Sequence, residues 1–150
     1  MYDLDKEIGG LPFMLELDDY DRSRITSIFR AVSKQEKLPA GSVLFASGDT
    51  ASDDGYIVYE GVVVIEGPDG VTKTVLPTSL IGEMKQFDFD GKHHRMATVR
   101  AEDEVQALHF SWQELYSALD KSLKPEEVKE FRTALWRYAW MHYLDLQGEL

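Results

Sequence analysis

The sequence lacks cysteine altogether, and this absence removes several kinds of chemistry at once. Disulfides, thiolate catalysis and cysteine-based zinc sites are all excluded. Long hydrophobic runs are also missing, and the longest are far too short to cross a bilayer, so we expect no membrane insertion. The first ten residues, MYDLDKEIGG, are acidic and lack the cationic and apolar stretches of a secretory signal. We therefore expect a cytoplasmic protein.

Positive charge is scarce as well. The chain has 16 lysine and arginine residues against 27 aspartate and glutamate residues, which gives a formal net charge of −11. An acidic surface repels nucleic-acid phosphates unless a local basic patch overrides it, and the lysines and arginines are scattered. We therefore expect no nucleic-acid partner. A chain of 150 residues that is 43% hydrophobic can build one core, which predicts a single domain over residues 1–150.

Helical spacing marks the beginning of the chain. In the segment 11–34, apolar side chains recur every three or four positions between Phe13 and Val32, as expected for a helix that packs one face against a core. Asp18 or Asp19 is the expected cap of this helix, because a short acidic side chain can accept a backbone N–H at a helix start.

A second helical segment, 111–147, ends the chain. Ser111 is expected to cap a helix over 112–119, and Pro125 is expected to open a longer helix, where its missing N–H costs nothing. The longer helix carries two neighbouring apolar stripes, one of Val128, Phe131, Leu135, Ala139, His142 and Leu146, and one of Trp136, Trp140 and Tyr143.

Between these helices, the segment 36–110 has the pattern of short strands and turns. Apolar runs such as 56–59 alternate with glycine-containing turns, and Pro68-Asp69-Gly70 predicts a tight turn between two strands. Many short strands with regular glycines favour a barrel or jelly roll over a parallel α/β sheet. The expected fold is mainly β: a double-stranded β-helix (jelly roll) with an N-terminal helix and C-terminal helices.

No arrangement of residues predicts an enzyme. No serine lies in a nucleophile elbow, His109 lies in a predicted strand, and the glycine-rich patterns of triphosphate and dinucleotide sites are missing. Asp88, Asp90, His93 and His94 share one segment, but nothing in their spacing fixes the geometry of a metal site. We therefore expect no catalytic residue, no metal and no cofactor.

Three stretches of the middle segment follow one another as they do in a known family. Residues 38–49 match opening strands, residues 55–64 match a Tyr-x-Val-x-x-Gly-x-Val-x-Val hairpin, and residues 81–83 with 95–101 match the two halves of a phosphate-binding cassette. The chain thus resembles the cyclic-nucleotide-binding domain family, which includes catabolite activator proteins and the regulatory domains of cyclic-nucleotide-dependent kinases and channels. The resemblance covers about residues 13–119.

The resemblance implies a ligand site. Arg95 would hold the cyclic phosphate, a role that suits a planar fork of charge-assisted donors. Glu83 would accept the ribose 2′-hydroxyl. In the family's kinases a threonine after the arginine is associated with cGMP, whereas Met96 has no hydroxyl, so we expect cAMP rather than cGMP. The rest of the cradle would come from Gly82, Met84, Met96 and Ala97.

Departures from the family pattern keep other functions open. The segment before Arg95 is a few residues longer than usual, has no proline before the arginine, and brings Asp88 and Asp90 near the phosphate, where they would repel it unless they point outward. These differences permit altered affinity, a different anionic ligand, or a degenerate β-roll that acts as a nucleotide-independent docking or dimerisation module. An ion pair between Glu83 and Arg95 that only ties two loops together is the purely structural alternative.

The apolar arc of the last helix is wide and needs a cover, either a ligand, a second subunit or another protein. The resemblance implies a lid over the base, and Trp136, Trp140 and Tyr143 could stack on a purine. An interface with a protein partner or in a homodimer is the interpretation that we favour for them. Transcription factors of the family carry a helix-turn-helix after this helix, but the sequence stops at Leu150. We therefore expect the signal to pass through the C-terminal helix to another protein.

Overall fold

The described residues of the computed structural model, 2–67, 70–89 and 91–146, form two four-stranded antiparallel sheets. Their strands are Lys34–Leu38 (β1), Val43–Phe45 (β2), Asp54–Glu60 (β3), Val63–Glu66 (β4), Thr72–Val75 (β5), Ser79–Ile81 (β6), Thr98–Ala101 (β7) and Val105–Ser111 (β8). One sheet has the order β1-β8-β3-β6, and the other has the order β2-β7-β4-β5. This arrangement confirms the predicted jelly roll.

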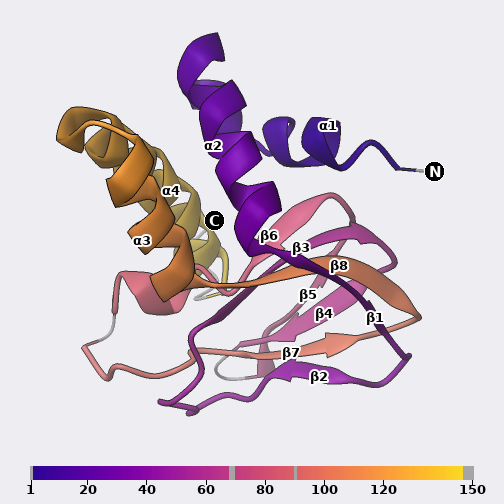
Figure 1. Cartoon of the computed structure of the whole chain (residues 1–150). Coiled ribbons are helices and arrows are strands. Elements are labelled where there is room, and N and C mark those ends of the chain that lie inside the picture. The colour runs from indigo at the N-terminus through magenta and orange to yellow at the C-terminus, as the bar shows by residue number, and fades with distance from the viewer. Residues whose placement is uncertain (1, 68–69, 90, 147–150) are drawn as a thin grey trace.

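Helices cover the outer side of the β1-β8-β3-β6 sheet, opposite the second sheet (Figure 1). They are Leu4–Gly9 (α1), Asp19–Val32 (α2), Trp112–Ser122 (α3) and Pro125–Leu146 (α4), with short 3-10 turns at Met14–Glu16 (η1) and Met84–Gln86 (η3). Helices at both ends of the chain therefore pack on the same face of one sheet, as the predicted architecture requires.

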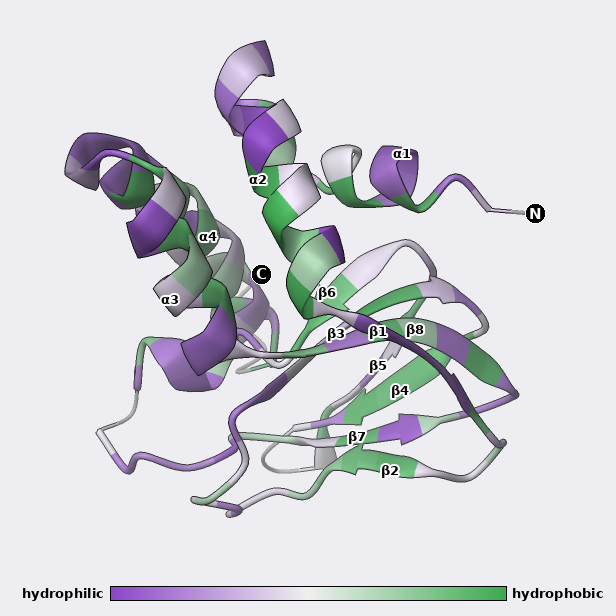
Figure 2. Ribbon diagram, in the orientation of Figure 1, coloured by the Kyte–Doolittle hydropathy of each residue, from purple (hydrophilic) through white to green (hydrophobic). Residues whose placement is uncertain are grey.

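Two hydrophobic cores share the β1-β8-β3-β6 sheet. On β3, Ile57 and Tyr59 face the helices, while Tyr56 and Val58 face the interior of the roll. A strand that is covered on both faces has a continuous rather than alternating hydrophobic run, which is what residues 56–59 show. In Figure 2, most of β4 is hydrophobic, whereas most of β1 is hydrophilic. β1 is an exposed edge strand with the sequence KQEKL, and it therefore lacks the apolar residues by which a strand is predicted.

The N-terminal segment predicted as helical, 11–34, contains two separate helical elements. Leu17 has an extended backbone, which separates η1 from α2. Asp18 then caps α2, as predicted: its carboxylate accepts the backbone N–H of Asp21 at 2.8 Å. The additional helix α1 spans fewer than two turns, too few for an apolar period to reveal it.

The C-terminal helices begin where the sequence predicts. The Ser111 hydroxyl accepts the backbone N–H of Glu114 and caps α3, which continues to Ser122. Pro125 is the first residue of α4. No helix of the described residues is long and apolar enough to cross a membrane.

Some predicted features lie outside the described residues. They are Pro68 and Asp69 of the predicted turn, Asp90 of the long segment before Arg95, and the last predicted helical residue, Gln147.

Phe131 offers a test of the core between helices and sheet. Its ring is fully buried and lies 5.9 Å from Phe13 and 6.1 Å from Phe29, centroid to centroid. Phe131→Ala should lower the free energy of unfolding by about 3–5 kcal/mol, because it removes buried area and leaves a cavity. Urea denaturation measures the change. Leu15→Ala, at a side chain that is 60% exposed, is the matched control and should change it little.

Candidate functional site

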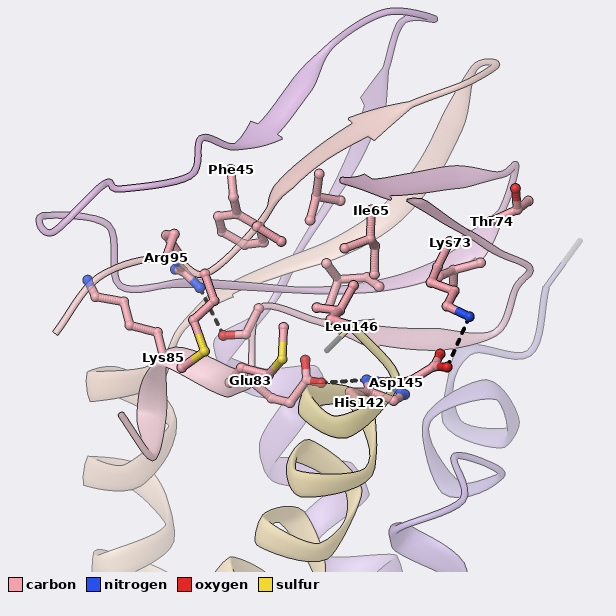
Figure 3. A pocket seen from close by; sticks show the side chains of 17 residues that line it. Phe45, Ile65, Lys73, Thr74, Glu83, Lys85, Arg95, His142, Asp145 and Leu146 are labelled. Carbon is pink, nitrogen blue, oxygen red and sulfur yellow. Dashed lines mark hydrogen bonds and ion pairs between the residues drawn. The ribbon is translucent and has the colours of Figure 1, made fainter. Parts of the chain in front are cut away.

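A cavity of about 130 Å³ opens between the interior of the roll and the last turns of α4 (Figure 3). Its walls come from both sheets, from the turn after β6, from the segment before β7 and from α4. All six residues that the sequence predicts for ligand binding line it, namely Gly82, Glu83, Met84, Arg95, Met96 and Ala97.

The turn after β6 depends on glycine. Gly82 has a φ of +98°, and a Cβ at this position would lie 2.7 Å from the Phe45 ring and 2.9 Å from the carbonyl oxygen of Asp54. Only glycine tolerates both the positive φ and this close approach. The Gly82 carbonyl accepts hydrogen bonds from Arg95 and from the indole N–H of Trp112. The turn is therefore fixed from two sides, and it presents Glu83 to the cavity.

Arg95 is buried with its guanidinium 3.9 Å from the centre of the Phe45 ring. It donates to the carbonyl oxygens of Gly82 and Asp54, at 2.9 and 2.8 Å, and to the Ser52 hydroxyl at 3.0 Å. Burial lowers the pKa of Arg95, and nearby carboxylates, led by that of Asp54, oppose this effect. Its Nε has no hydrogen-bond partner among the described residues. A buried, charged donor without a partner is suited to an anionic ligand.

Glu83 is a buried carboxylate whose partner is a histidine. The Glu83 Oε1 lies 2.6 Å from Nδ1 of His142 on α4. The two loops that carry Glu83 and Arg95 are joined through the Gly82 carbonyl, and no direct Glu83–Arg95 ion pair is found among the described residues. The structural alternative from the sequence, a simple Glu83–Arg95 pair, therefore does not describe this arrangement.

Glu83 also sets the charge of His142. Burial lowers the pKa of His142, but the Glu83 carboxylate, through its charge and its hydrogen bond, and the Asp145 carboxylate together outweigh burial. The pKa of His142 consequently lies above its ordinary value, which favours an imidazolium paired with a carboxylate.

Two lysines lie near the same cavity. Lys85 donates to the carbonyl oxygen of Thr50 at 2.9 Å and to that of Ser52, and Lys73 pairs with Asp145 at 3.1 Å. Lys73, His142, Asp145 and Leu146 are cavity residues that sequence reasoning did not assign to the site. The apolar stripe of the last helix does contain His142 and Leu146, so the signal was present, but it indicates a covered face without indicating what covers it.

A polar chain continues behind Arg95 on the β1-β8-β3-β6 sheet. His109 lies 2.8 Å from both Glu36 and Asp54, and its ring stacks on Tyr56 with centroids 4.5 Å apart. Burial lowers the pKa of His109, but its two carboxylate partners raise it further, to above the ordinary value. The network ties β1, β3 and β8 together beside the cavity.

The three aromatic residues predicted as a lid or interface lie elsewhere on α4. Trp136, Trp140 and Tyr143 are absent from the cavity lining; they stack on one another and pack against Phe89. The face of α4 that covers the cavity carries His142, Asp145 and Leu146 instead. The aromatic residues form a separate group between α4 and the segment that follows η3.

Asp88, in the segment before Arg95, is paired outside the cavity. Asp88 accepts the backbone N–H of His93 at 2.7 Å and pairs with the imidazole of the same residue at 2.9 Å. Neither residue lines the cavity. Within the described part of the chain, no group of three histidine, aspartate or glutamate side chains could hold a metal ion.

The Glu83–His142 contact can be tested by NMR titration of the histidine rings. Glu83→Gln should lower the pKa of His142, because it removes the largest favourable charge, and should leave that of His109 unchanged as an internal control. An unchanged His142 would contradict the contact. Because the folded-state pKa is raised, the contact stabilises the fold fully below the unfolded value of about 6.5, and this stabilisation is lost as pH rises through the folded value.

Solved structures with the same fold are found by comparison. A protein from Geobacter metallireducens GS-15 named as a cyclic nucleotide-binding protein is 19% identical with a TM-score of 0.67, over 96% of this chain and 99% of that one. The N-terminal domain of a transcriptional regulator from Streptomyces coelicolor A3(2) is 29% identical, with a TM-score of 0.62 over 90% of this chain and 93% of that one.

A third similar structure is the c-di-GMP responsive global regulator CLP of Xanthomonas campestris. It is 22% identical with a TM-score of 0.63, and the match covers 84% of this chain and 61% of that one. No curated protein sequence matches the chain significantly. The family model for the cyclic nucleotide-binding domain matches residues 35–122, which include both halves of the cassette around Glu83 and Arg95. The chain therefore belongs to the cyclic nucleotide-binding domain family.

Proposed function

We propose that the chain is a regulatory sensor domain that binds cAMP in the cavity beneath α4 and signals through that helix to a protein partner. The observation that carries the proposal is Arg95, a buried cation at the cavity wall with one donor, Nε, left without a partner among the described residues. A cyclic phosphate supplies one negative charge and acceptor oxygens, which are what this donor lacks. The proposed unit is one domain over the whole chain, regulatory rather than catalytic, in the cytoplasm.

The other parts of the nucleotide have matching groups in the cavity. Glu83, which lines the cavity, is suited to accept a hydrogen bond from the ribose 2′-hydroxyl (Figure 3). The apolar side chains that line the roll interior, such as Ile65 and Val99, suit a nucleobase. Met96 offers no hydroxyl to a guanine or to the phosphate, which supports cAMP over cGMP.

Isothermal calorimetry with cAMP, cGMP and c-di-GMP tests the proposal. The native protein should bind cAMP saturably and more tightly than the other two. Arg95→Lys keeps the charge but removes the planar fork, and should weaken cAMP binding roughly 10- to 150-fold, the equivalent of one charged hydrogen bond of about 1.5–3 kcal/mol. Arg100→Lys is the matched control, because Arg100 pairs with Glu66 and does not line the cavity.

Arg95 also donates to four backbone and hydroxyl acceptors, so the folded state of each variant must be verified by thermal unfolding before titration. Equal cAMP affinity in native protein and folded Arg95→Lys would overturn the assigned role. Preference for c-di-GMP would keep the site and change the ligand. No heat with any of the three nucleotides would favour the docking alternative.

The docking or dimerisation alternative has its own supporting observation. Trp136 is 43% exposed, and it stacks on Trp140 in the packed group with Phe89 and Tyr143. Exposed aromatic surface of this kind is typical of protein–protein contacts. If it mediates association, Trp136→Glu should shift sedimentation equilibrium towards monomer, whereas Leu15→Glu, also at an exposed apolar residue, should not. A native protein that is monomeric at all concentrations would contradict the dimer.

A further inference from the structure

The last turns of α4 extend into the cavity that the proposed ligand would occupy (Figure 3). Leu146 is only 3% exposed, and it belongs to the hydrophobic core of the roll interior together with Phe45, Ile65, Ile81 and Val99. The rest of the buried face of α4, including Phe131 and Leu135, packs in the other core, between the helices and the sheet. Leu146 is therefore the point at which α4 leaves its own core and enters the roll.

The residue that follows β4 is a glycine, and it leaves space for Leu146. Gly67 follows β4, and a Cβ at Gly67 would lie 3.1 Å from Leu146 Cδ2 and 3.4 Å from Leu146 Cβ. The absence of a side chain at Gly67 lets the last turn of α4 lie directly against the strand end. The end of α4 therefore packs closely against the end of β4 at Gly67.

Two polar contacts hold the same turns in place. His142 engages Glu83 at 2.6 Å, and Asp145 engages Lys73 at 3.1 Å. Both partners of α4 line the cavity: Glu83 is the proposed acceptor for the ribose, and Lys73 is a cation within reach of an anionic ligand. Asp145 itself places a negative charge at the cavity, which opposes the entry of a phosphate.

The space that remains is small. The cavity measures about 130 Å³, whereas pockets for ligands of drug size occupy roughly 300–1,000 Å³. A cyclic mononucleotide contains a purine, a ribose and a phosphate and belongs to that size class. With Leu146 inside the roll, the remaining volume is too small for the nucleotide, and one oxygen of Glu83, the proposed ribose acceptor, is already paired with His142.

We propose that residues 142–146 of α4 act as an internal plug, which must leave the cavity before a nucleotide can bind. This inference rests on the proposed function of the same site. Departure of the plug frees Glu83 for the ribose, frees Lys73 for the anion, and removes Leu146 and Asp145 from the ligand's place. The observed affinity is then the intrinsic affinity multiplied by the fraction of molecules whose plug is out.

The proposal predicts that a weaker plug binds nucleotide better. Leu146→Ser removes the apolar group that holds the plug, so the Kd for cAMP should fall roughly tenfold to a hundredfold, the range expected for the burial of one leucine side chain. Met141→Ser is the matched control, because Met141 is an apolar residue of the same helix that is 51% exposed and does not line the cavity. Its Kd should equal that of the native protein. Calorimetry measures all three.

Amide hydrogen exchange of residues 140–146 gives a readout that needs no ligand. Exchange should be faster in ligand-free Leu146→Ser than in the native protein and in Met141→Ser. Addition of cAMP to the native protein should also speed exchange in this segment, because the nucleotide displaces it. A Kd that rises or stays unchanged in Leu146→Ser, or a cAMP-induced slowing of exchange at 140–146, would overturn the plug and indicate a lid that closes over the ligand.

Failure of the proposed function would look different. If neither the native protein nor Leu146→Ser binds cAMP, cGMP or c-di-GMP, the nucleotide assignment fails, and the exchange data alone decide the plug. If amide exchange at residues 140–146 is faster only in Leu146→Ser, this result would support the inference that Leu146 holds the last turn of α4 in the roll. Equal exchange in all three proteins would refute the plug as well.

Discussion

The buried guanidinium of Arg95 is the constraint on which the site depends. A cation taken out of water is costly unless acceptors surround it, and here the carbonyls of Gly82 and Asp54 and the Ser52 hydroxyl meet that requirement. By holding the Gly82 carbonyl, Arg95 also fixes the turn that presents Glu83. In the proposed sensor, phosphate binding and loop architecture share this one side chain, so a substitution at Arg95 would change both. Its Nε, which lacks a partner among the described residues, would bond a ligand without breaking an existing bond.

α4 connects the two cores of the molecule, and its faces have different partners. Phe131 and Leu135 anchor the first part of the helix among the other helices, whereas Leu146 belongs to the roll interior. Because the anchor and the plug lie at different ends of α4, bending or unwinding between them would displace the last turns while the first turns stay in their core. The aromatic group around Trp140 lies on another face of α4 and packs on Phe89. In the proposed sensor, movement of the plug would pass to this group along the helix.

The sequence predicted those elements that are marked by a run of apolar residues or by a single residue with a known role at helix starts. The apolar run 56–59 gave β3 because both of its faces are covered, and Asp18, Ser111 and Pro125 gave helix starts through local chemistry. The apolar pattern did not predict β1, because the side chains of this exposed edge strand are mostly hydrophilic. The positions of Arg95 and Glu83 followed from the family resemblance, but the contact between Glu83 and His142 did not, since helical periodicity tells which face of α4 is covered and not which core covers it.

If Glu83 binds the ribose as proposed, the Glu83–His142 contact also limits how strongly a nucleotide can bind. A buried carboxylate left without a partner would be costly, so an empty site with a free Glu83 would be unstable and a ribose hydroxyl would gain the full benefit of pairing with it. In this structure the imidazole already supplies that partner, with its pKa raised by the same carboxylate. The nucleotide therefore gains only the difference between the ribose contact and the imidazole contact. In this proposal, the free energy of nucleotide binding depends on the difference between the ribose–Glu83 contact and the His142–Glu83 contact that it replaces.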